Sequence, residues 1–327
     1  MAEFDFAIAG TDLFSGLLAG LLARDHGKKI VRIGRRPSAQ RLWRAIPLAL
    51  PLATRPAAWR MVRAGEAEMR DLTGQIGGPD AMNSSEVALF GDYGNTTVAL
   101  DHLVHIAAGY GHQVRRLDGG WALRRVTVLD RDAIDAGLSG WLEAAGVRTV
   151  DEAPADAALT ILADDEAILD SLDEDRRPPL LISEAMTSTM IVSPRPPAIP
   201  IQRFVDRGVT LVARPGNTIL ALVSGEHDVE ARLTSALRGP FPVKRLATTR
   251  YRRLITRDGA PLIGRLKGTR HFVVAGLGDS AAFLAPAMAR FLAGTSERDE
   301  KSWFAAHDPS RPRASVVDFA PGAEAAQ

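Results

Sequence analysis

The stretch that decides the fold begins with Phe4-Asp-Phe-Ala-Ile-Ala9 and continues directly into Gly10-Thr-Asp-Leu-Phe-Ser-Gly16. A short apolar run that ends at a glycine predicts a buried strand followed by a tight turn. Apolar residues at helical spacing extend from Leu13 to Ala23, and Asp25-His26-Gly27 predicts the end of that helix. Lys29 to Ile33 is strand-like again. Strand, turn, helix and strand within about 30 residues predict a parallel crossover unit.

The predicted turn lies where dinucleotide-binding proteins carry the pattern G-x-G-x-x-G. Gly10 keeps the first glycine, whereas Asp12 and Ser15 replace the second and third. In the intact pattern the second glycine lets the backbone approach a pyrophosphate, so Asp12 adds a negative charge at that point. One interpretation is a degenerate cofactor site that includes Gly10, Thr11, Asp12, Phe14 and Ser15. The other is that Asp12 simply caps the helix.

The second strand is followed by Gly34, Arg35 and Arg36, where such a unit usually places a carboxylate for the ribose hydroxyls. The arginines are consistent with contact to the adenine and pyrophosphate of a flavin, or to the ribose phosphate of the phosphorylated nicotinamide cofactor. A third interpretation leaves them solvated in a surface loop.

The remaining chain predicts further elements of an α/β fold. Helices are expected at Trp59 to Ile76, Leu100 to Ala108, Asp130 to Ala145 and Ala281 to Ala293, and strands at Val87 to Phe90, Thr96 to Ala99, Trp121 to Leu129, Val147 to Val150, Ala158 to Leu162 and Phe272 to Ala275. A strand-rich block covers Ile182 to Val192, Arg203 to Ala213 and Thr218 to Ser224. This block predicts a second domain built on an antiparallel sheet.

Composition excludes several classes of protein. Forty basic and 39 acidic residues give a net charge of +1, which provides no global attraction for nucleic acid or an anionic membrane. The absence of cysteine excludes disulfides, thiolate nucleophiles and flavin attachment through sulfur. Leu13 to Ala23 is too short to span a bilayer, and the N-terminus lacks a signal-peptide pattern, so we expect a cytoplasmic protein. His102 and His105 lie at helical spacing without an evident third ligand, so no metal site is predicted.

Four segments, in this order, resemble the D-amino-acid-oxidase-like, FAD-dependent oxidoreductases. They are the N-terminal unit, Leu129 to Ala133 with its helix to Gly146, RLITRDGAPLIG from Arg253 to Gly264, and VAGLGDSAAFLAP from Val274 to Pro286. WFAAHDPSR, from Trp303 to Arg311, is similar to the closing segment of that family, so the resemblance covers most of the chain. The tail after Pro312 is rich in alanine, proline and charge, which predicts disorder.

The resemblance implies an FAD/NAD(P)-binding Rossmann-like domain and a substrate or interaction domain. The first would comprise residues 1–40, 125–175 and 255–300, the second would comprise residues 41–124 and 176–254, and residues 301–327 would form the tail. It further implies that Gly276, Leu277, Gly278, Asp279 and Ser280 present backbone N–H groups to a flavin ring. Asp279 and Ser280 stand where glycines are usual, and the alternative is that they cap the following helix.

Two further positions follow from the resemblance. Arg253 falls where the family often places an arginine that holds a substrate carboxylate through two hydrogen bonds. Asp164, in the run LTILADD from Leu159 to Asp165, takes the place of a glycine beside the adenosine. Three expected cofactor contacts, at Asp12, Asp164 and Asp279, have therefore changed to carboxylates, which disfavours ordinary FAD binding.

The implied function is FAD-dependent oxidation of an amine or amino acid, with hydride transfer from the carbon beside nitrogen to the flavin. The alternative, favoured by the altered glycines, is a catalytically inactive subunit or scaffold that has lost ordinary FAD binding. Such a protein would act by binding a small molecule or a protein partner. The fold is common to both hypotheses and does not decide between them.

Overall fold

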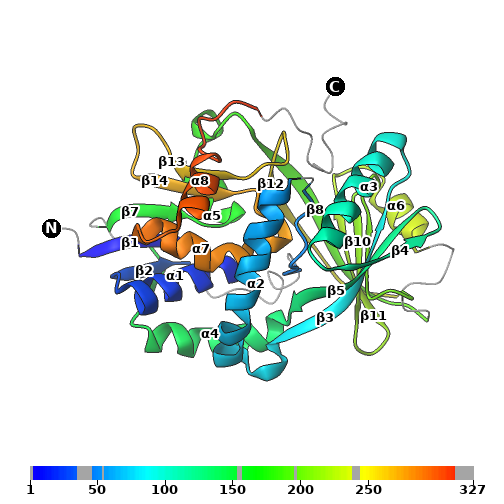
Figure 1. Cartoon of the computed structure of the whole chain (residues 1–327), viewed down its shortest axis with the longest axis horizontal. Coiled ribbons are helices and arrows are strands. Elements are labelled where there is room, and N and C mark those ends of the chain that lie inside the picture. Colours follow the sequence, from blue (N-terminus) through cyan, green and yellow to red (C-terminus); the bar gives the residue numbers. More distant parts are fainter. Residues whose placement is uncertain are drawn as a thin grey trace.

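The computed structural model describes residues 3–34, 46–53, 55–152, 157–194, 197–237 and 244–313, whose strands form two sheets (Figure 1). The first sheet has the order β13-β14-β7-β1-β2-β6. Its strands are β1 (Phe4–Ala9), β2 (Ile30–Ile33), β6 (Arg148–Val150), β7 (Ala157–Leu162), β13 (Leu262–Arg265) and β14 (His271–Ala275). Neighbours pair in parallel except β13 with β14. The carboxyl ends of its parallel strands therefore share one edge.

The crossover unit predicted from the N-terminal sequence is confirmed. Helix α1 (Leu13–His26) connects β1 to β2, and it ends at Gly27, whose φ of 61° is left-handed. Its first turn is capped by Asp12, whose side chain accepts a hydrogen bond from the backbone N–H of Ser15. Leu17, Leu18 and Ala19 are fully buried. Burial of apolar residues on both sides of α1 places this helix inside the domain rather than on its surface.

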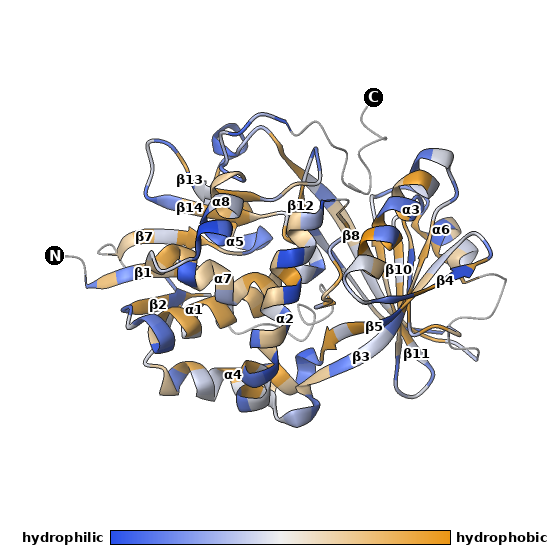
Figure 2. Cartoon of the chain, in the orientation of Figure 1, coloured by the Kyte–Doolittle hydropathy of each residue, from blue (hydrophilic) through white to orange (hydrophobic). Residues whose placement is uncertain are grey.

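Helices α4 (Arg131–Ala144) and α7 (Ala281–Ala293) each pack on both α1 and α2 (Pro56–Gly77). Helix α7 and the neighbouring strands carry mainly apolar residues, whereas α2 is mixed (Figure 2). A Cβ atom at Gly65 of α2 would collide with the backbone oxygen of Phe283 in α7, and one at Gly137 of α4 would collide with that of Ile76. Glycine is therefore what allows these helices to cross at such short distance.

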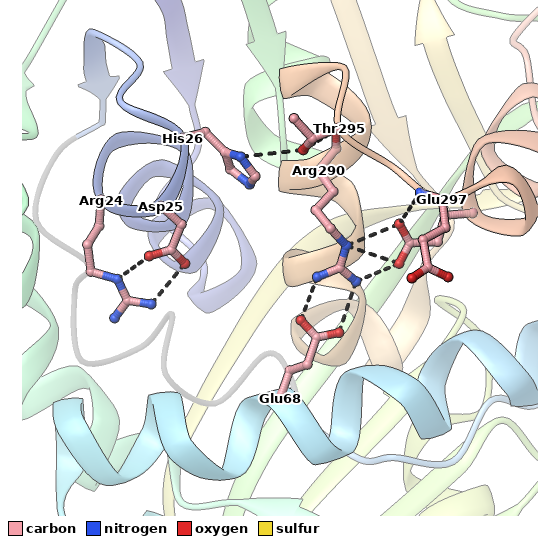
Figure 3. A network of polar contacts seen from close by, with 8 residues as sticks. Arg24, Asp25, His26, Glu68, Arg290, Thr295 and Glu297 are labelled. Carbon is pink, nitrogen blue, oxygen red and sulfur yellow. Dashed lines mark hydrogen bonds and ion pairs between the residues drawn. The ribbon is translucent and has the colours of Figure 1, made fainter.

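An ion-pair network ties α7 to the helices on either side of it (Figure 3). Arg290 of α7 donates to both carboxylate oxygens of Glu68 in α2, at 2.6 and 2.9 Å, and to Glu300 of α8 (Arg298–Ala305). These hydrogen bonds, the Glu68 bonds first, raise the pKa of Arg290 above its ordinary value. The Glu300 side chain also accepts from the backbone N–H of Glu297, which closes a capping box at the start of α8.

The second sheet has the order β12-β8-β11-β10-β9-β3-β5-β4. Its strands are β3 (Met82–Phe90), β4 (Gln113–Leu117), β5 (Gly120–Leu129), β8 (Leu181–Val192), β9 (Ile201–Phe204), β10 (Val209–Arg214), β11 (Thr218–Ser224) and β12 (Lys244–Thr256). Neighbours pair antiparallel except β3 with β9, which pair in parallel. The predicted second sheet is thus present, with one parallel pair in it.

Shorter helices lie around the second sheet and at its border with the first. Helix α3 (Gly94–Gly109) packs on β4 and β5, and α6 (Val229–Ala236) packs on β10 and β11. Helix α5 (Asp165–Ser171) follows β7 and packs on both β7 and β12. The 3₁₀ turns are η2 (Pro79–Ala81), η3 (Glu174–Arg176) and η4 (Gly278–Ser280). Among the described helices, none combines the length and apolar character needed to cross a membrane.

Two predicted elements differ in the structure. Thr96 to Ala99 belongs to α3 rather than to a strand. In that helix the buried residues Leu100, Leu103 and Ala107 recur at helical spacing and form its apolar face. The run from Arg203 to Ala213 is divided between β9 and β10 by a turn at Gly208, whose φ is 57°. The predicted disorder after Pro312 falls almost wholly on residues 314–327, which lie outside the described residues.

Candidate functional site

A cavity of about 600 Å³ lies between the two sheets. It begins at Thr11 and Asp12 in the turn after β1 and passes Asp164 in the turn after β7. It continues to the β14–α7 turn and to the facing strands β9 to β12 of the second sheet. The carboxyl edge of a parallel sheet is the usual position of ligands in α/β folds, and this volume suits a small organic molecule.

The turn after β1 already holds an anion, which is supplied by the chain itself. The backbone N–H groups of Thr11 and Asp12 donate to Oδ2 of Asp164, at 2.6 and 3.3 Å. The backbone N–H of Ser15 donates to Oδ1 of Asp12 at 2.8 Å. We call the Thr11 and Asp12 donors the anion cradle. In a dinucleotide-binding protein, groups of this kind face a phosphate.

Asp164 connects two turns at once. While Oδ2 accepts from the anion cradle, Oδ1 accepts from the backbone N–H of Ala167 at 2.8 Å and caps α5. A Cβ atom at Gly10 would lie 3.2 Å from the Asp164 carboxyl carbon and 2.9 Å from Cβ of Ser15. Gly10 therefore leaves the space in which the Asp164 carboxylate reaches the cradle.

Carboxylates cluster at this end of the cavity. Burial, followed by the charge of Asp164, raises the pKa of Asp12 to about 6. Burial likewise raises the pKa of Asp165 to about 7, with smaller contributions from Asp164 and Asp12. The balancing cations are Arg131, which pairs with Asp135 at 3.1 Å, and Arg32. A second anion placed among these carboxylates would meet repulsion unless one of them moves or takes up a proton.

The Arg32 side chain lies behind the anion cradle. Its Nη2 donates to the backbone oxygen of Asp12 and to Oγ of Ser15, at 3.4 and 3.3 Å. Gly34 follows directly after that strand, and a Cβ atom there would lie 2.7 Å from Cγ2 of Thr11. Gly34 thus lies directly against the first turn, whereas Arg35 and Arg36 lie outside the described residues.

The turn between β14 and α7 forms the other end of the cavity. Gly276 and Gly278 have left-handed φ values of 73° and 58°, which the absence of a side chain permits. Ser280 is the N-cap residue of α7, as the alternative expected, but no side-chain capping hydrogen bond is made there. The Asp279 carboxylate pairs with Arg203 of β9, and the Ser280 hydroxyl donates to the backbone oxygen of Leu48 at 3.1 Å. Both side chains therefore join this turn to other segments.

The structure brings most of the predicted site residues to one cavity. Thr11, Asp12, Phe14, Arg253 and the turn from Gly276 to Ser280 line its wall, whereas Gly10, Ser15 and Gly34 support the first turn from behind. Arg253 donates from Nε to Oε2 of Glu184 at 2.8 Å, and the two residues are direct cross-strand neighbours on β12 and β8. His102 and His105 belong to α3 and do not line this cavity. The described residues contain no cluster of three or more candidate metal ligands.

Arg203 is the cavity residue that the sequence analysis missed. Its side chain is 8% exposed, it lines the cavity, and it pairs with Asp279. Burial lowers its pKa to about 10, with a further contribution from the nearby Arg253 cation. An arginine between Ile201 and Phe204 in a short apolar strand is the signal that was available in the sequence.

Comparison with known proteins shows the fold. No family model matches the sequence. No curated protein matches it significantly. Among solved structures, glycine oxidase from Geobacillus kaustophilus superposes with a TM-score of 0.71 at 16% identity, covering 96% of this chain and 100% of that one. L-proline dehydrogenase from P. horikoshii gives 0.71 at 13% identity, with 95% and 98% coverage.

Iminodiacetate oxidase from Chelativorans sp. BNC1 is a third such structure, with a TM-score of 0.67 at 14% identity and coverage of 97% and 99%. The match extends over nearly the whole of each chain, so it includes both sheets. The α/β fold with two sheets that the resemblance implies is therefore confirmed.

Proposed function

We propose that this protein is an FAD-dependent oxidoreductase of the amine and amino-acid oxidase type. The reaction is transfer of hydride from the carbon beside an amine nitrogen to the flavin. The observation that carries the proposal is the single cavity that joins the anion cradle to the Gly276–Ser280 turn and to the second sheet. That arrangement offers one end for a phosphate, one end for a ring, and a facing wall for a substrate.

The structural neighbours support this class of reaction. Glycine oxidase, L-proline dehydrogenase and iminodiacetate oxidase are named for the oxidation of small molecules that contain a C–N bond. Because fold does not by itself specify function, the proposal rests on the cavity and is only strengthened by these names.

The phosphate end of the cavity fits FAD on one condition. The Thr11 and Asp12 N–H groups converge on an anion, and the Asp164 carboxylate is the stand-in for a phosphate oxygen. Asp164 must leave the cradle for a phosphate to enter, and it lines the cavity into which it would turn. The cradle would then hold the pyrophosphate, while Gly34 lets the second strand lie close to it.

At the ring end, Gly276, Leu277 and Gly278 would present backbone groups to the flavin, which supplies the acceptor for the hydride. Apolar side chains of Leu50, Met186 and Leu222 line the cavity and would exclude water from it. Arg253, to which the resemblance assigns a substrate carboxylate, lines the same cavity. The substrate is accordingly a small amine or amino acid.

A second candidate function follows from one observation, the occupation of the anion cradle by Asp164. If the carboxylate never leaves, the chain keeps the flavoprotein fold without the cofactor and acts by binding a small molecule or a protein partner. The same contact therefore separates the two candidates.

The deciding experiment is the visible absorption spectrum of the protein after incubation with excess FAD and desalting. A denatured sample measures released flavin, and the melting temperature is measured with and without FAD. Stoichiometric flavin supports the oxidoreductase, and a screen of amines and amino acids then identifies the substrate. A colourless protein whose melting temperature FAD does not change supports the scaffold instead.

A further inference from the structure

Arg203 and Arg253 are neighbouring arginines in one cavity, but their hydrogen bonding differs. Arg253 directs both Nε and Nη2 at Oε2 of Glu184, at 2.8 and 2.7 Å. Glu184 is its direct neighbour across β8 and β12, and the side chain of Glu184 is 12% exposed. This is an internal cross-strand ion pair, so these guanidinium donors are used within the sheet.

Arg203 is less well satisfied. Its Nη2 donates to Oδ2 of Asp279, while Nε is buried and has no hydrogen-bond partner among the residues that the structure describes. A guanidinium has five N–H donors, and a buried donor without an acceptor costs about 1–3 kcal/mol. The buried side chain of Arg203 therefore has hydrogen-bonding capacity that the protein does not use.

Asp279, the ion-pair partner of Arg203, lines the cavity together with it. Asp279 belongs to the turn expected beside the flavin ring, and its side chain is 27% exposed. It reaches Arg203 from the opposite wall of the cavity, because Arg203 lies on β9 of the second sheet. A planar carboxylate in the cavity matches the fork of a guanidinium better than the single Asp279 oxygen does.

We propose that Arg203, rather than Arg253, binds the carboxylate of the ligand, and that Asp279 occupies this position when no ligand is bound. The assignment of that ligand as an amino-acid substrate rests on the proposed function, whereas carboxylate binding itself does not need the flavin. Arg253 then acts as part of the sheet and contributes positive potential at a distance.

The test is isothermal titration of the protein, as purified and after FAD loading, with benzoate. Benzoate has a carboxylate on an apolar body that suits the largely apolar wall, and benzamide is its neutral control. We expect benzoate to bind more tightly than benzamide. Arg203→Gln should weaken benzoate binding at least about tenfold, since a charge-assisted pair is lost.

Four variants complete the comparison. Asp279→Asn removes the competing carboxylate and should tighten benzoate binding about tenfold. Arg253→Gln and the exposed Arg116→Gln should each leave it within about threefold of wild type. Arg203→Lys keeps the charge, so it provides a folded protein with weakened, non-bidentate binding if Arg203→Gln does not fold.

Equal binding of benzoate and benzamide would overturn the inference. So would a tenfold loss in Arg253→Gln with no loss in Arg203→Gln or Arg203→Lys, which would return the carboxylate to Arg253. These outcomes are separate from the flavin measurement. If benzoate binding depends on Arg203 but the protein takes up no FAD, this inference stands and the proposed oxidoreductase is overturned. If the protein takes up FAD but benzoate binding does not depend on Arg203, the proposed oxidoreductase stands and this inference is overturned.

Discussion

The Asp164 carboxylate accepts a hydrogen bond from the Thr11 backbone N–H at 2.6 Å, across 153 positions of the sequence. This contact links the turn after β1 to the turn after β7, which are neighbouring strands of the first sheet. It fills the position where a bound phosphate would accept the same hydrogen bond. A phosphate and the Asp164 carboxylate would therefore compete for the same N–H group.

Replacing Asp164 should strengthen FAD binding. Asp164→Asn removes a negative charge from the anion cradle and keeps a residue that caps α5 well. We expect the Kd for FAD to fall about tenfold, as measured by quenching of flavin fluorescence. Asp170→Asn, an exposed position on the same helix, is the control and should change nothing. Equal FAD affinity in wild type and Asp164→Asn would show that this carboxylate does not compete with the cofactor.

Stability should fall as pH rises through the range in which Asp165 ionises. Its pKa is raised from 3.8 to about 7 by burial, so the folded state binds this proton more tightly than the unfolded state does. The stabilisation is complete below about pH 4 and is lost as pH approaches 7. Between pH 4 and pH 8, the free energy of unfolding of Asp165→Asn should therefore change by about 2 kcal/mol less than that of the wild type. This figure is reduced for partial solvent access.

Chemical denaturation at several pH values measures this effect. Asp170→Asn again serves as the control, because its side chain is exposed on the same helix. Asp12, whose pKa is raised to about 6, should behave in the same sense over a lower range of pH. If the free energy of unfolding depends on pH in Asp165→Asn as it does in the wild type, the ionising group is a residue other than Asp165.

Two glycines of α2 should respond to alanine in opposite directions. A Cβ atom at Gly65 would collide with the backbone oxygen of Phe283, whereas one at Gly74 meets nothing within 4 Å. Gly65→Ala should cost about 2–3 kcal/mol because α2 and α7 must separate. Gly74→Ala should stabilise the protein by about 0.5–1 kcal/mol, since alanine has a higher helix propensity than glycine at an exposed position. Thermal unfolding of both variants checks the prediction, and a stable Gly65→Ala protein would contradict the crossing.

The Arg290 network should contribute more than an exposed ion pair between the same helices. Arg290 bridges Glu68 of α2 and Glu300 of α8, and its side chain is 26% exposed. The control pair, Arg60 with Asp299, also joins α2 to α8 but is 60% and 66% exposed. We expect Arg290→Gln to cost about 1–2 kcal/mol and Arg60→Gln less than about 0.5 kcal/mol in urea unfolding. Comparable losses in both would show that the network adds nothing.

The parts of the fold that were predicted correctly depend on local patterns. The first crossover unit followed from apolar periodicity between Phe4 and Ile33, and α4 followed from Asp130 as its cap and Gly146 after its end. Thr96 to Ala99 was assigned to the wrong element because β-branched residues favour strands locally, while packing against the second sheet favours the helix.

The site was less accessible from sequence, because its contacts are distant along the chain. Asp164 was recognised as a departure from the expected glycine, but its bond to Thr11 depends on the pairing of β1 with β7. Arg203 and Asp279 are 76 positions apart, and no local pattern relates them. Arg253 was located in the cavity, yet its partner Glu184 is known only from the register of β8 and β12.

The order of strands in the first sheet also has a consequence for synthesis on the ribosome. Strand β1 lies between β2 and β7, and the sheet is completed by β13 and β14 near the end of the chain. At about 5–20 residues per second, synthesis takes on the order of tens of seconds to proceed from β1 to β13 and β14. The strands from β8 to β12 are synthesised one after another within that interval. Every strand of the second sheet is thus synthesised before the first sheet receives its last two strands.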